Sequence, residues 1–228
     1  MPHILLVGAS RGLGLALAAE YLKRGWRVVA TVRGAARTKL HDLVESSEGR
    51  LEIESLDIAE PDQIAALRER LAGQKFNVVF VNAGVANVPS EKIGEVSTEE
   101  FTRVMITNAL APMRVIEAFE SLVTPTGTIG AMSSGLGSVG GNVSGGWEVY
   151  RASKAALNTL MRSFAARPAQ SARSLVLIAP GWVRTDMGGP HASLGVDESI
   201  PKVVDVITAR AGEPGLRYLD YRGAVLAW

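Results

Sequence analysis

The sequence predicts an α/β protein built on a doubly wound parallel sheet of about seven strands, with helices on both faces. Short apolar runs alternate with helix-like runs from residue 4 to the end of the chain, and this alternation is typical of βαβ units. The run at 77–81 is almost continuously apolar, as expected of a parallel strand buried on both faces. A glycine-rich turn at Gly8–Gly14 joins the first apolar run to a helix-like run. No linker or repeat divides the chain, so we expect one domain over residues 1–228.

The order of the elements follows from where each apolar pattern begins and ends. Strands are expected at 4–7, 27–32, 51–58, 77–81, 128–132, 174–179 and 216–219. Helices are expected after the glycine turn up to Gly25, at 37–46, from Pro61, from a capping box at 97–100 through Phe119 with a bend near Pro112, at 147–164 and at 200–209.

Composition excludes several classes of function. Lys plus Arg number 24 and Asp plus Glu number 23, so the basic surplus typical of proteins that bind nucleic acid or anionic membranes is missing. Without cysteine the chain has no disulfide, no thiolate nucleophile and no cysteine-ligated metal. Its three histidines lack metal-ligand spacing, so we expect no metal. Neither a signal peptide nor an apolar run of about 18 residues is present, and we expect a soluble cytoplasmic protein.

The glycine turn has the properties of an anion site. The first N–H groups of a helix lack intrahelical partners and the helix dipole is positive there. Glycines at 8, 12 and 14 would let a pyrophosphate approach the backbone closely. The spacing G-x-x-x-G-x-G is a weak signal by itself, because glycine turns also join strands to helices without any ligand.

Polar and glycine residues also follow the other predicted strands. The clusters are Arg33, Asp57, Asn82-Ala83-Gly84, Ser133-Ser134 and Pro180-Gly181. In a parallel sheet the carboxyl ends of the strands meet at one edge, where ligands bind. Turn chemistry alone does not account for so many clusters, so we expect a ligand site at this edge.

Tyr150 and Lys154 form a second constellation. At positions i and i+4 they share one face of a helix. A free tyrosine, with a pKa near 10, is a poor acid–base group at neutral pH. A nearby ammonium favours the phenolate, so we expect Lys154 to lower the pKa of Tyr150. The pair would then exchange protons with a carbonyl or an alcohol, although such pairs also occur by chance.

Taken together, the motifs resemble the short-chain dehydrogenase/reductase family over essentially the whole chain, and more narrowly its C-factor and sniffer-type carbonyl reductase group. The narrower likeness rests on the serine-rich stretch 133–139, on 150–158, on 180–189 and on the ending 218–228. The resemblance implies a Rossmann-type fold and an oxidoreductase that transfers a hydride between a nicotinamide and a carbonyl. It implies a catalytic set of Asn108, Ser134, Tyr150 and Lys154.

In this set, Tyr150 would move the proton, Ser134 would polarise the carbonyl, and Lys154 would hold the nicotinamide ribose. Asn108 would help to hold a water that relays protons. Ser133 is a rival to Ser134 but is expected to be a satisfied hydroxyl at the end of a strand, because successive strand residues face opposite sides. The residues implied to bind the cofactor are Gly8, Ser10, Arg11, Gly12, Leu13, Gly14, Arg33, Asp57, Ile58, Asn82, Ala83, Gly84, Tyr150, Lys154, Pro180, Gly181, Val183 and Thr185.

The end of the second strand bears on the choice of cofactor. NAD sites usually offer a carboxylate there, whereas this strand leads into Arg33. A guanidinium binds a 2′-phosphate, and Arg11 in the glycine turn could assist it. We therefore predict that NADP(H) is preferred, with NAD(H) possible; Arg33 could also be an ordinary exposed arginine.

Substrate contacts and assembly are less specific. Leu136, Trp147, Trp182 and Met187 could form an apolar substrate pocket, although tryptophan is more often part of a core. A short lid is expected at 188–195, and a flexible glycine-rich loop at 135–146. The family resemblance implies a homodimer or homotetramer. We expect a small carbonyl or alcohol substrate; the alternatives are a C-factor-like regulator with little turnover and a purely structural domain.

Overall fold

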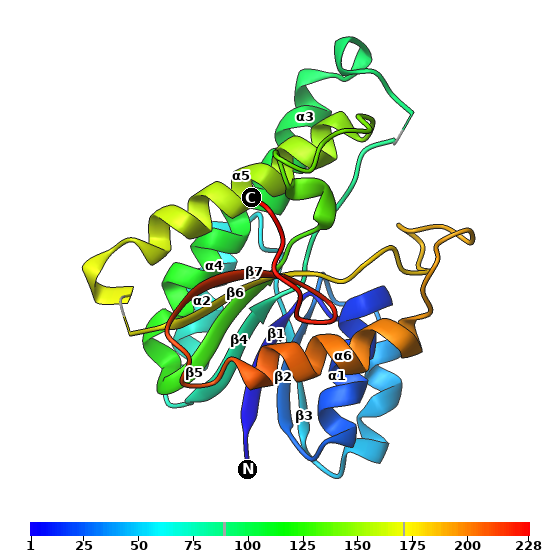
Figure 1. The fold of residues 1–228 in the computed structure, drawn as a ribbon. Coiled ribbons are helices and arrows are strands. Elements are labelled where there is room, and N and C mark those ends of the chain that lie inside the picture. The colour runs from blue at the N-terminus through cyan, green and yellow to red at the C-terminus, as the bar shows by residue number, and fades with distance from the viewer. Residues whose placement is uncertain (89, 171) are drawn as a thin grey trace.

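One seven-stranded sheet, parallel throughout, forms the centre of the protein (Figure 1). The computed structural model describes residues 1–88, 90–170 and 172–228. The strand order is β3-β2-β1-β4-β5-β6-β7, which confirms the predicted Rossmann-type fold. The strands are β1 (His3–Val7), β2 (Arg27–Val32), β3 (Leu51–Ser55), β4 (Phe76–Val81), β5 (Val123–Met132), β6 (Ser174–Ala179) and β7 (Gly215–Asp220).

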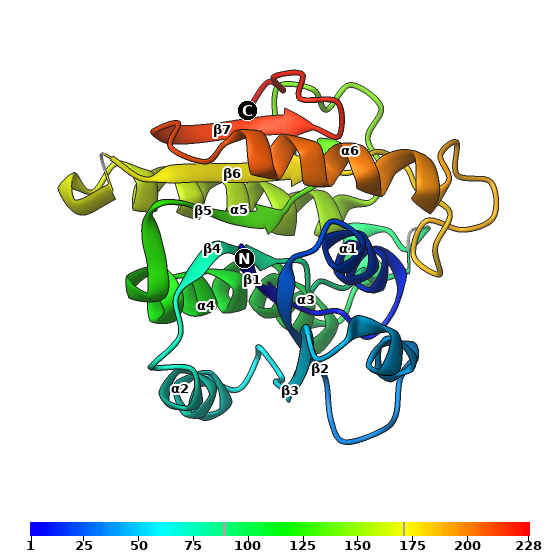
Figure 2. The same cartoon turned by 90° about the horizontal axis from the view of Figure 1, so that it is seen from below.

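Helices cover both faces of this sheet (Figure 2). Those of eight or more residues are α1 (Gly12–Lys23), α2 (Pro61–Arg70), α3 (Thr98–Met105), α4 (Ala111–Phe119), α5 (Glu148–Ala165) and α6 (Val196–Ala209). Along β1, Leu5 and Val7 pack into a core shared with α2, α4 and α5. Ile4 and Leu6 pack into the core shared with α1 and α6. This alternation explains why the run at 4–7 is continuously apolar.

Two expected helices differ from the prediction. The segment predicted as a helix at 37–46 forms only short 3₁₀ turns at Lys39–Leu43 and Glu45–Ser47. Only Leu40 and Ser47 in these turns are buried, so little packing is available to stabilise a regular helix. The long helix was expected to bend near Pro112, and its regular α-helical hydrogen bonding is interrupted just before that residue, while the helix continues from α3 into α4. The interruption is a π-helical turn at Ile106–Leu110.

Strand order determines where a ligand can lie. β1 pairs with β2 on one side and with β4 on the other, so the connections depart in opposite directions at this point. Open α/β sheets bind ligands outside the carboxyl ends of the strands at such a switch point. Within the described ranges, no helix is both long enough and apolar enough to cross a membrane.

Candidate active site

The glycine loop after β1 is shaped by close backbone approaches. A Cβ added at Gly8, whose φ is +92°, would lie 2.7 Å from Ala83 in the loop after β4. A Cβ at Gly14 would lie 2.0 Å from the Gly8 carbonyl oxygen. That same oxygen accepts a hydrogen bond of 2.8 Å from Asn82 Nδ2. Any side chain at these two glycines would therefore clash with the loop, whatever the ligand.

The N-terminus of α1 fits an anionic cofactor. Arg11 occupies the N-cap position, and its side chain makes no capping hydrogen bond. No acidic residue lies in the first turn, so the helix dipole faces no negative charge from α1 itself. The Gly8 N–H donates to Thr31 Oγ1 at 3.0 Å, which ties the loop to β2. Exposed amide donors on a fixed glycine loop are what a pyrophosphate requires.

Tyr150 and Lys154 lie on one face of α5, as predicted. Lys154 Nζ is 5.8 Å from the centroid of the Tyr150 ring and donates to the Met132 carbonyl oxygen at 2.9 Å. Lys154 is 3% exposed, and burial lowers its pKa to about 8. A buried ammonium with several N–H donors can hold the hydroxyl groups of a ribose.

The prediction that Lys154 lowers the pKa of Tyr150 is wrong. Burial raises the pKa of Tyr150 to about 12, and a hydrogen bond with the Ser134 side chain offsets only part of that effect. The physical reason is desolvation, which disfavours the phenolate more than its surroundings stabilise it. Sequence spacing places Lys154 beside the ring but does not show how strongly the fold desolvates the two groups.

The two serines after β5 have different partners. Ser133 is buried, and its hydroxyl donates to Asn158 Oδ1 on α5 at 2.7 Å, as expected of a satisfied strand-end hydroxyl. Ser134 is half-buried; its Oγ accepts from the Leu136 N–H at 3.1 Å. Ser134 is also the serine whose side chain is near enough to Tyr150 to lower the pKa of that phenol.

Asn108 occupies the π-helical turn and is fully buried. Its Oδ1 accepts from the Val85 N–H at 2.8 Å, and its Nδ2 donates to the Val85 carbonyl oxygen at 2.7 Å and to Ser153 Oγ at 2.9 Å. A Cβ at Gly84 would lie 3.2 Å from Asn108 Oδ1 and 3.4 Å from Lys154 Nζ. Asn108 therefore borders the same small space as Lys154. π-turns are often found at functional sites.

The predicted phosphate-binding arginines have different surroundings. Arg33 is exposed directly after β2. Arg11 Nη1 forms an ion pair with Asp186 Oδ2 at 2.6 Å, with both side chains 76% exposed. Such a surface pair contributes about 0–1 kcal/mol, so a phosphate could displace Asp186.

The other predicted cofactor residues lie along the carboxyl edge, several with structural partners of their own. Asp57 Oδ1 accepts from the Ala59 N–H at 3.0 Å, and the Ile58 side chain packs into the core. Val183 is buried. Thr185 Oγ1 accepts from the Gly188 N–H at 3.1 Å. A Cβ at Gly12 would lie 3.9 Å from Thr185 Cγ2, so the segment after β6 approaches the glycine loop. Ser10, Pro180 and Gly181 lie in these same two loops, and Leu13 lies in the first turn of α1.

The predicted substrate residues only partly converge. The Trp147 ring meets the Tyr150 ring edge-on, with 5.7 Å between centroids, and its φ of 55° is unusual for a residue with a side chain. Leu136 lies in the turn after Ser134 and is half-buried. Trp182 and Met187 are 55% and 44% exposed, and Trp182 Nε1 donates to the Gly188 carbonyl oxygen at 2.8 Å. Trp147 is thus the aromatic residue in contact with the proposed acid.

Sequence reasoning missed several residues around this site. Arg151 donates from Nε to the Gly146 carbonyl oxygen at 2.8 Å and from Nη2 to Ser144 Oγ at 3.0 Å. These bonds hold part of the loop that was expected to be flexible. The Tyr218 hydroxyl donates to the Ser134 carbonyl oxygen. Neither contact follows a local sequence pattern; the closest signal was that the chain ending 218–228 matched the family group.

The carboxyl edge brings a helix N-terminus suited to an anion next to an acid–base pair, an arrangement typical of a dinucleotide-dependent oxidoreductase. The sequence model of the family described as short chain dehydrogenase matches residues 2–193. The chain therefore belongs to the short-chain dehydrogenase family. It is an NAD(P)-dependent oxidoreductase that acts on C=O and CH–OH groups.

Solved structures similar to this protein match it over its whole length, and a curated relative matches two thirds of it. A short-chain dehydrogenase/reductase from Burkholderia multivorans, crystallised with bound NADP, is 61% identical, with a TM-score of 0.97 over 100% of this chain and 99% of its own. The carbonyl reductase Sniffer of D. melanogaster is 32% identical, with a TM-score of 0.90 over 100% of both chains. The C-signal of Myxococcus xanthus is 36% identical over 67% of this chain and 92% of its own. The predicted family and group are confirmed, and the predicted cofactor is the one bound in the Burkholderia structure.

Proposed function

We propose that this protein uses NADPH to reduce a small carbonyl compound, with Tyr150 as the proton donor. One observation carries the proposal: the loop after β4 approaches the glycine loop at Ala83 and the acid–base pair at Gly84. A Cβ at Gly8 would touch Ala83, and a Cβ at the next residue, Gly84, would touch Lys154 Nζ. A cofactor whose phosphates lie on the α1 N-terminus would therefore extend its ribose toward Lys154.

Each residue of the catalytic set then has a defined task. The Tyr150 hydroxyl donates its proton to the carbonyl oxygen, and a pKa near 12 keeps that proton in place at neutral pH. The Ser134 hydroxyl donates a hydrogen bond to the same oxygen and stabilises its developing charge. Lys154 binds the ribose hydroxyls. When bound, the reduced nicotinamide supplies the hydride for the carbonyl carbon.

Asn108 and the remaining cofactor residues support this arrangement. Asn108 Oδ1 accepts one hydrogen bond and keeps a second lone pair near the space at Gly84. We propose that a water held there passes protons to Lys154. The rest of the dinucleotide would be lined by the other predicted cofactor residues, which are Gly8, Ser10, Arg11, Gly12, Leu13, Gly14, Asp57, Ile58, Asn82, Ala83, Gly84, Pro180, Gly181, Val183 and Thr185.

The preference for NADP(H) over NAD(H) is supported by the end of β2. Arg33 is exposed there, where an NAD site would carry an acid. Arg33→Ala should weaken NADPH binding about tenfold or more, since a charge-assisted contact to phosphate is lost, and should leave NADH binding unchanged. Arg37→Ala is a matched control, because Arg37 already pairs with Asp42 at 2.8 Å. Equal losses for NADPH and NADH would contradict the preference.

NADPH oxidation tests the function directly, followed by absorbance against quinones, diketones, aldehydes and ketosteroids. Tyr150→Phe should lower kcat by about 10²–10⁴ and leave the Kd for NADPH within about twofold, because the ring remains in place. Tyr21→Phe, a buried tyrosine in the core on the far face of the sheet, is the matched control. Full activity of Tyr150→Phe would refute the mechanism.

A regulator with little turnover is the competing function, favoured by the likeness to the C-signal. It predicts tight NADPH binding with no oxidation on any carbonyl. The intact set Asn108, Ser134, Tyr150 and Lys154 supports the enzyme, because a protein that only binds the cofactor has no use for the serine or the phenol. We further propose one domain over residues 1–228 and a cytoplasmic location.

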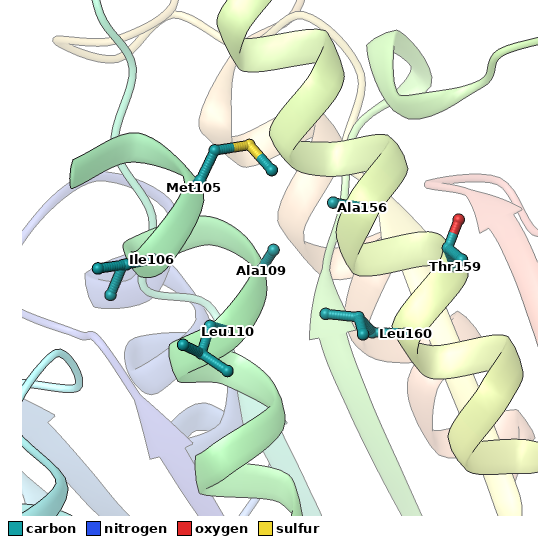
Figure 3. A pocket seen from close by; sticks show the side chains of 7 residues that line it. All are labelled: Met105, Ile106, Ala109, Leu110, Ala156, Thr159 and Leu160. Atoms are coloured by element: carbon teal, nitrogen blue, oxygen red, sulfur yellow. The ribbon is translucent and has the colours of Figure 1, made fainter. Parts of the chain in front are cut away.

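We also propose that the protein forms a homodimer or a homotetramer through α5. An apolar groove of about 420 Å³ lies between the π-turn and α5. Its lining, drawn in Figure 3, is Met105, Ile106, Ala109, Leu110, Ala156, Thr159 and Leu160. Leu160→Glu should give a smaller species in light scattering, while Val143→Glu, on an exposed loop, should not. A wild-type protein that is already monomeric would refute this assembly.

A further inference from the structure

The chain after β7 turns back along the strand and ends beside α5 (Figure 1). We call residues 221–228 the return segment. Its turn is closed by the Asp220 N–H, which donates to the Ala224 carbonyl oxygen at 2.8 Å. The Leu226 N–H donates to the Tyr218 carbonyl oxygen at 2.9 Å. These bonds fix the return segment to the outer edge of β7, the edge that is not paired with β6.

Two hydrogen bonds join β7 and the return segment to the loop after β5. This loop carries Ser134, the proposed hydrogen-bond donor to the substrate oxygen. The Tyr218 hydroxyl donates to the Ser134 carbonyl oxygen. The Gly140 N–H donates to the Trp228 carbonyl oxygen at 3.0 Å. The loop 134–140 is therefore held at its first and last residues by groups more than 80 positions away in sequence.

Packing between aromatic rings anchors Tyr218 and Trp228, the two residues that hold the loop. The Tyr218 and Trp228 rings are tilted against each other, with 5.4 Å between centroids. The Arg162 guanidinium of α5 lies 4.8 Å from the centroid of the Trp228 ring, a cation–π contact. Tyr218 is 1% exposed. The return segment is thus fixed both to β7 and to the helix that carries Tyr150 and Lys154.

The loop needs this support because of its composition. It contains Gly135, Gly137 and Gly140, and glycine leaves the backbone with more conformations than any other residue. Ser134 sits at its start, and its side chain lies close enough to Tyr150 to lower the pKa of that phenol. Rotation of the Ser134 peptide would move its Oγ away from the phenol, and an error of about 1 Å in such a group can cost about 10²-fold in rate.

We propose that Tyr218 and Trp228 are positioning residues that hold the loop 134–140 so that Ser134 stays aligned with Tyr150. This inference rests on the proposed function of Ser134. It assigns the return segment a task at the site although none of its residues belongs to the catalytic set.

Three variants test the inference: Tyr218→Phe, Trp228→Ala and Trp228→Phe. Tyr218→Phe removes only a hydroxyl, and Trp228→Ala removes the ring that anchors the segment. Each should lower kcat at least fivefold while the Kd for NADPH stays within twofold, because the glycine loop lies elsewhere. In the double variant Tyr218→Phe/Trp228→Ala, the loss of kcat should be smaller than the product of the two single losses, because both residues hold one loop. Trp228→Phe keeps an aromatic ring and should recover most of the kcat.

Amide hydrogen exchange provides a readout that does not depend on activity. Peptides covering 134–141 should exchange at least tenfold faster in Tyr218→Phe and Trp228→Ala, with α1 unchanged. Tyr21→Phe is the matched control and should change neither readout. Faster exchange with unchanged kcat, or no change in exchange, would overturn the inference. A wild-type protein inactive on every carbonyl would overturn the proposed function instead, and exchange would still show whether the loop is held.

Discussion

Replacing Lys154 with methionine should stabilise the cofactor-free protein at neutral pH and abolish its activity. Burial lowers the pKa of Lys154 from 10.5 to about 8, so the folded state holds the proton less tightly than the unfolded chain. Below about pH 8, burial of the ammonium lowers the free energy of unfolding by its full amount. This loss of stability shrinks as the pH rises and is gone near pH 10.5. The difference between these pKa values corresponds to about 3 kcal/mol.

The hydrogen bond from Lys154 to the Met132 carbonyl oxygen opposes that gain. Its loss costs about 1–2 kcal/mol, because the carbonyl would lose this partner in the interior. The net gain expected for Lys154→Met at pH 7 is therefore about 1–2 kcal/mol, or a Tm higher by about 2–8 °C for a domain of this size. Near pH 10 the gain should vanish or reverse, since the wild-type lysine is then largely neutral.

Urea unfolding of the cofactor-free protein at pH 7 and near pH 10 measures this effect. Lys23→Met is the matched control: its side chain is 80% exposed, and the variant should differ from wild type by less than about 0.5 kcal/mol at either pH. The reasoning is refuted if Lys154→Met is less stable than wild type by the same amount at both pH values. That result would mean that packing and hydrogen bonding, rather than desolvation of the ammonium, dominate at this position.

Three further predictions concern other parts of the fold. Asn108→Ala should lower the free energy of unfolding by about 2–4 kcal/mol, because it leaves both backbone groups of Val85 without their partner; a urea titration showing less than about 0.5 kcal/mol would contradict this. Tyr21→Phe should raise stability by about 1 kcal/mol, since the Tyr21 hydroxyl is buried without a hydrogen-bond partner in the described part of the chain; a lower Tm would argue against it. Gly8→Ala should weaken NADPH binding or folding far more than Gly34→Ala. Both glycines have a positive φ, but no atom lies within 4 Å of a Cβ added at Gly34. Equal losses for the two variants in NADPH titration and in unfolding would be inconsistent with the close approach at Gly8.

Much of the fold was accessible from local patterns. The runs at 4–7 and 77–81 alternate between two buried faces, so their apolar character predicted central parallel strands, and β1 and β4 lie at the centre of the sheet. The helix predicted at 37–46 was wrong because a polar pattern does not show which residues are buried. In the 3₁₀ turns of this segment only Leu40 and Ser47 are buried. The long helix was expected to bend near Pro112, and the π-turn at Ile106–Leu110 interrupts it directly before that residue. Proline is a strong local signal, whereas the contacts of Asn108 with Val85 and Ser153 across the fold have no local signal.

The chain itself determined the class of sheet, the glycine loop and the Tyr150–Lys154 pair, because each depends on periodicity or spacing within a few residues. Only the tertiary structure decided the electrostatics and the support of the site. Burial raises the pKa of Tyr150 and lowers that of Lys154, and desolvation is the sum of contributions from residues scattered along the chain. The contact between Tyr218 and Ser134 spans 84 positions. Such contacts form only when the sheet brings β5 and β7 onto the two sides of β6. They cannot be predicted from the spacing of residues along the sequence.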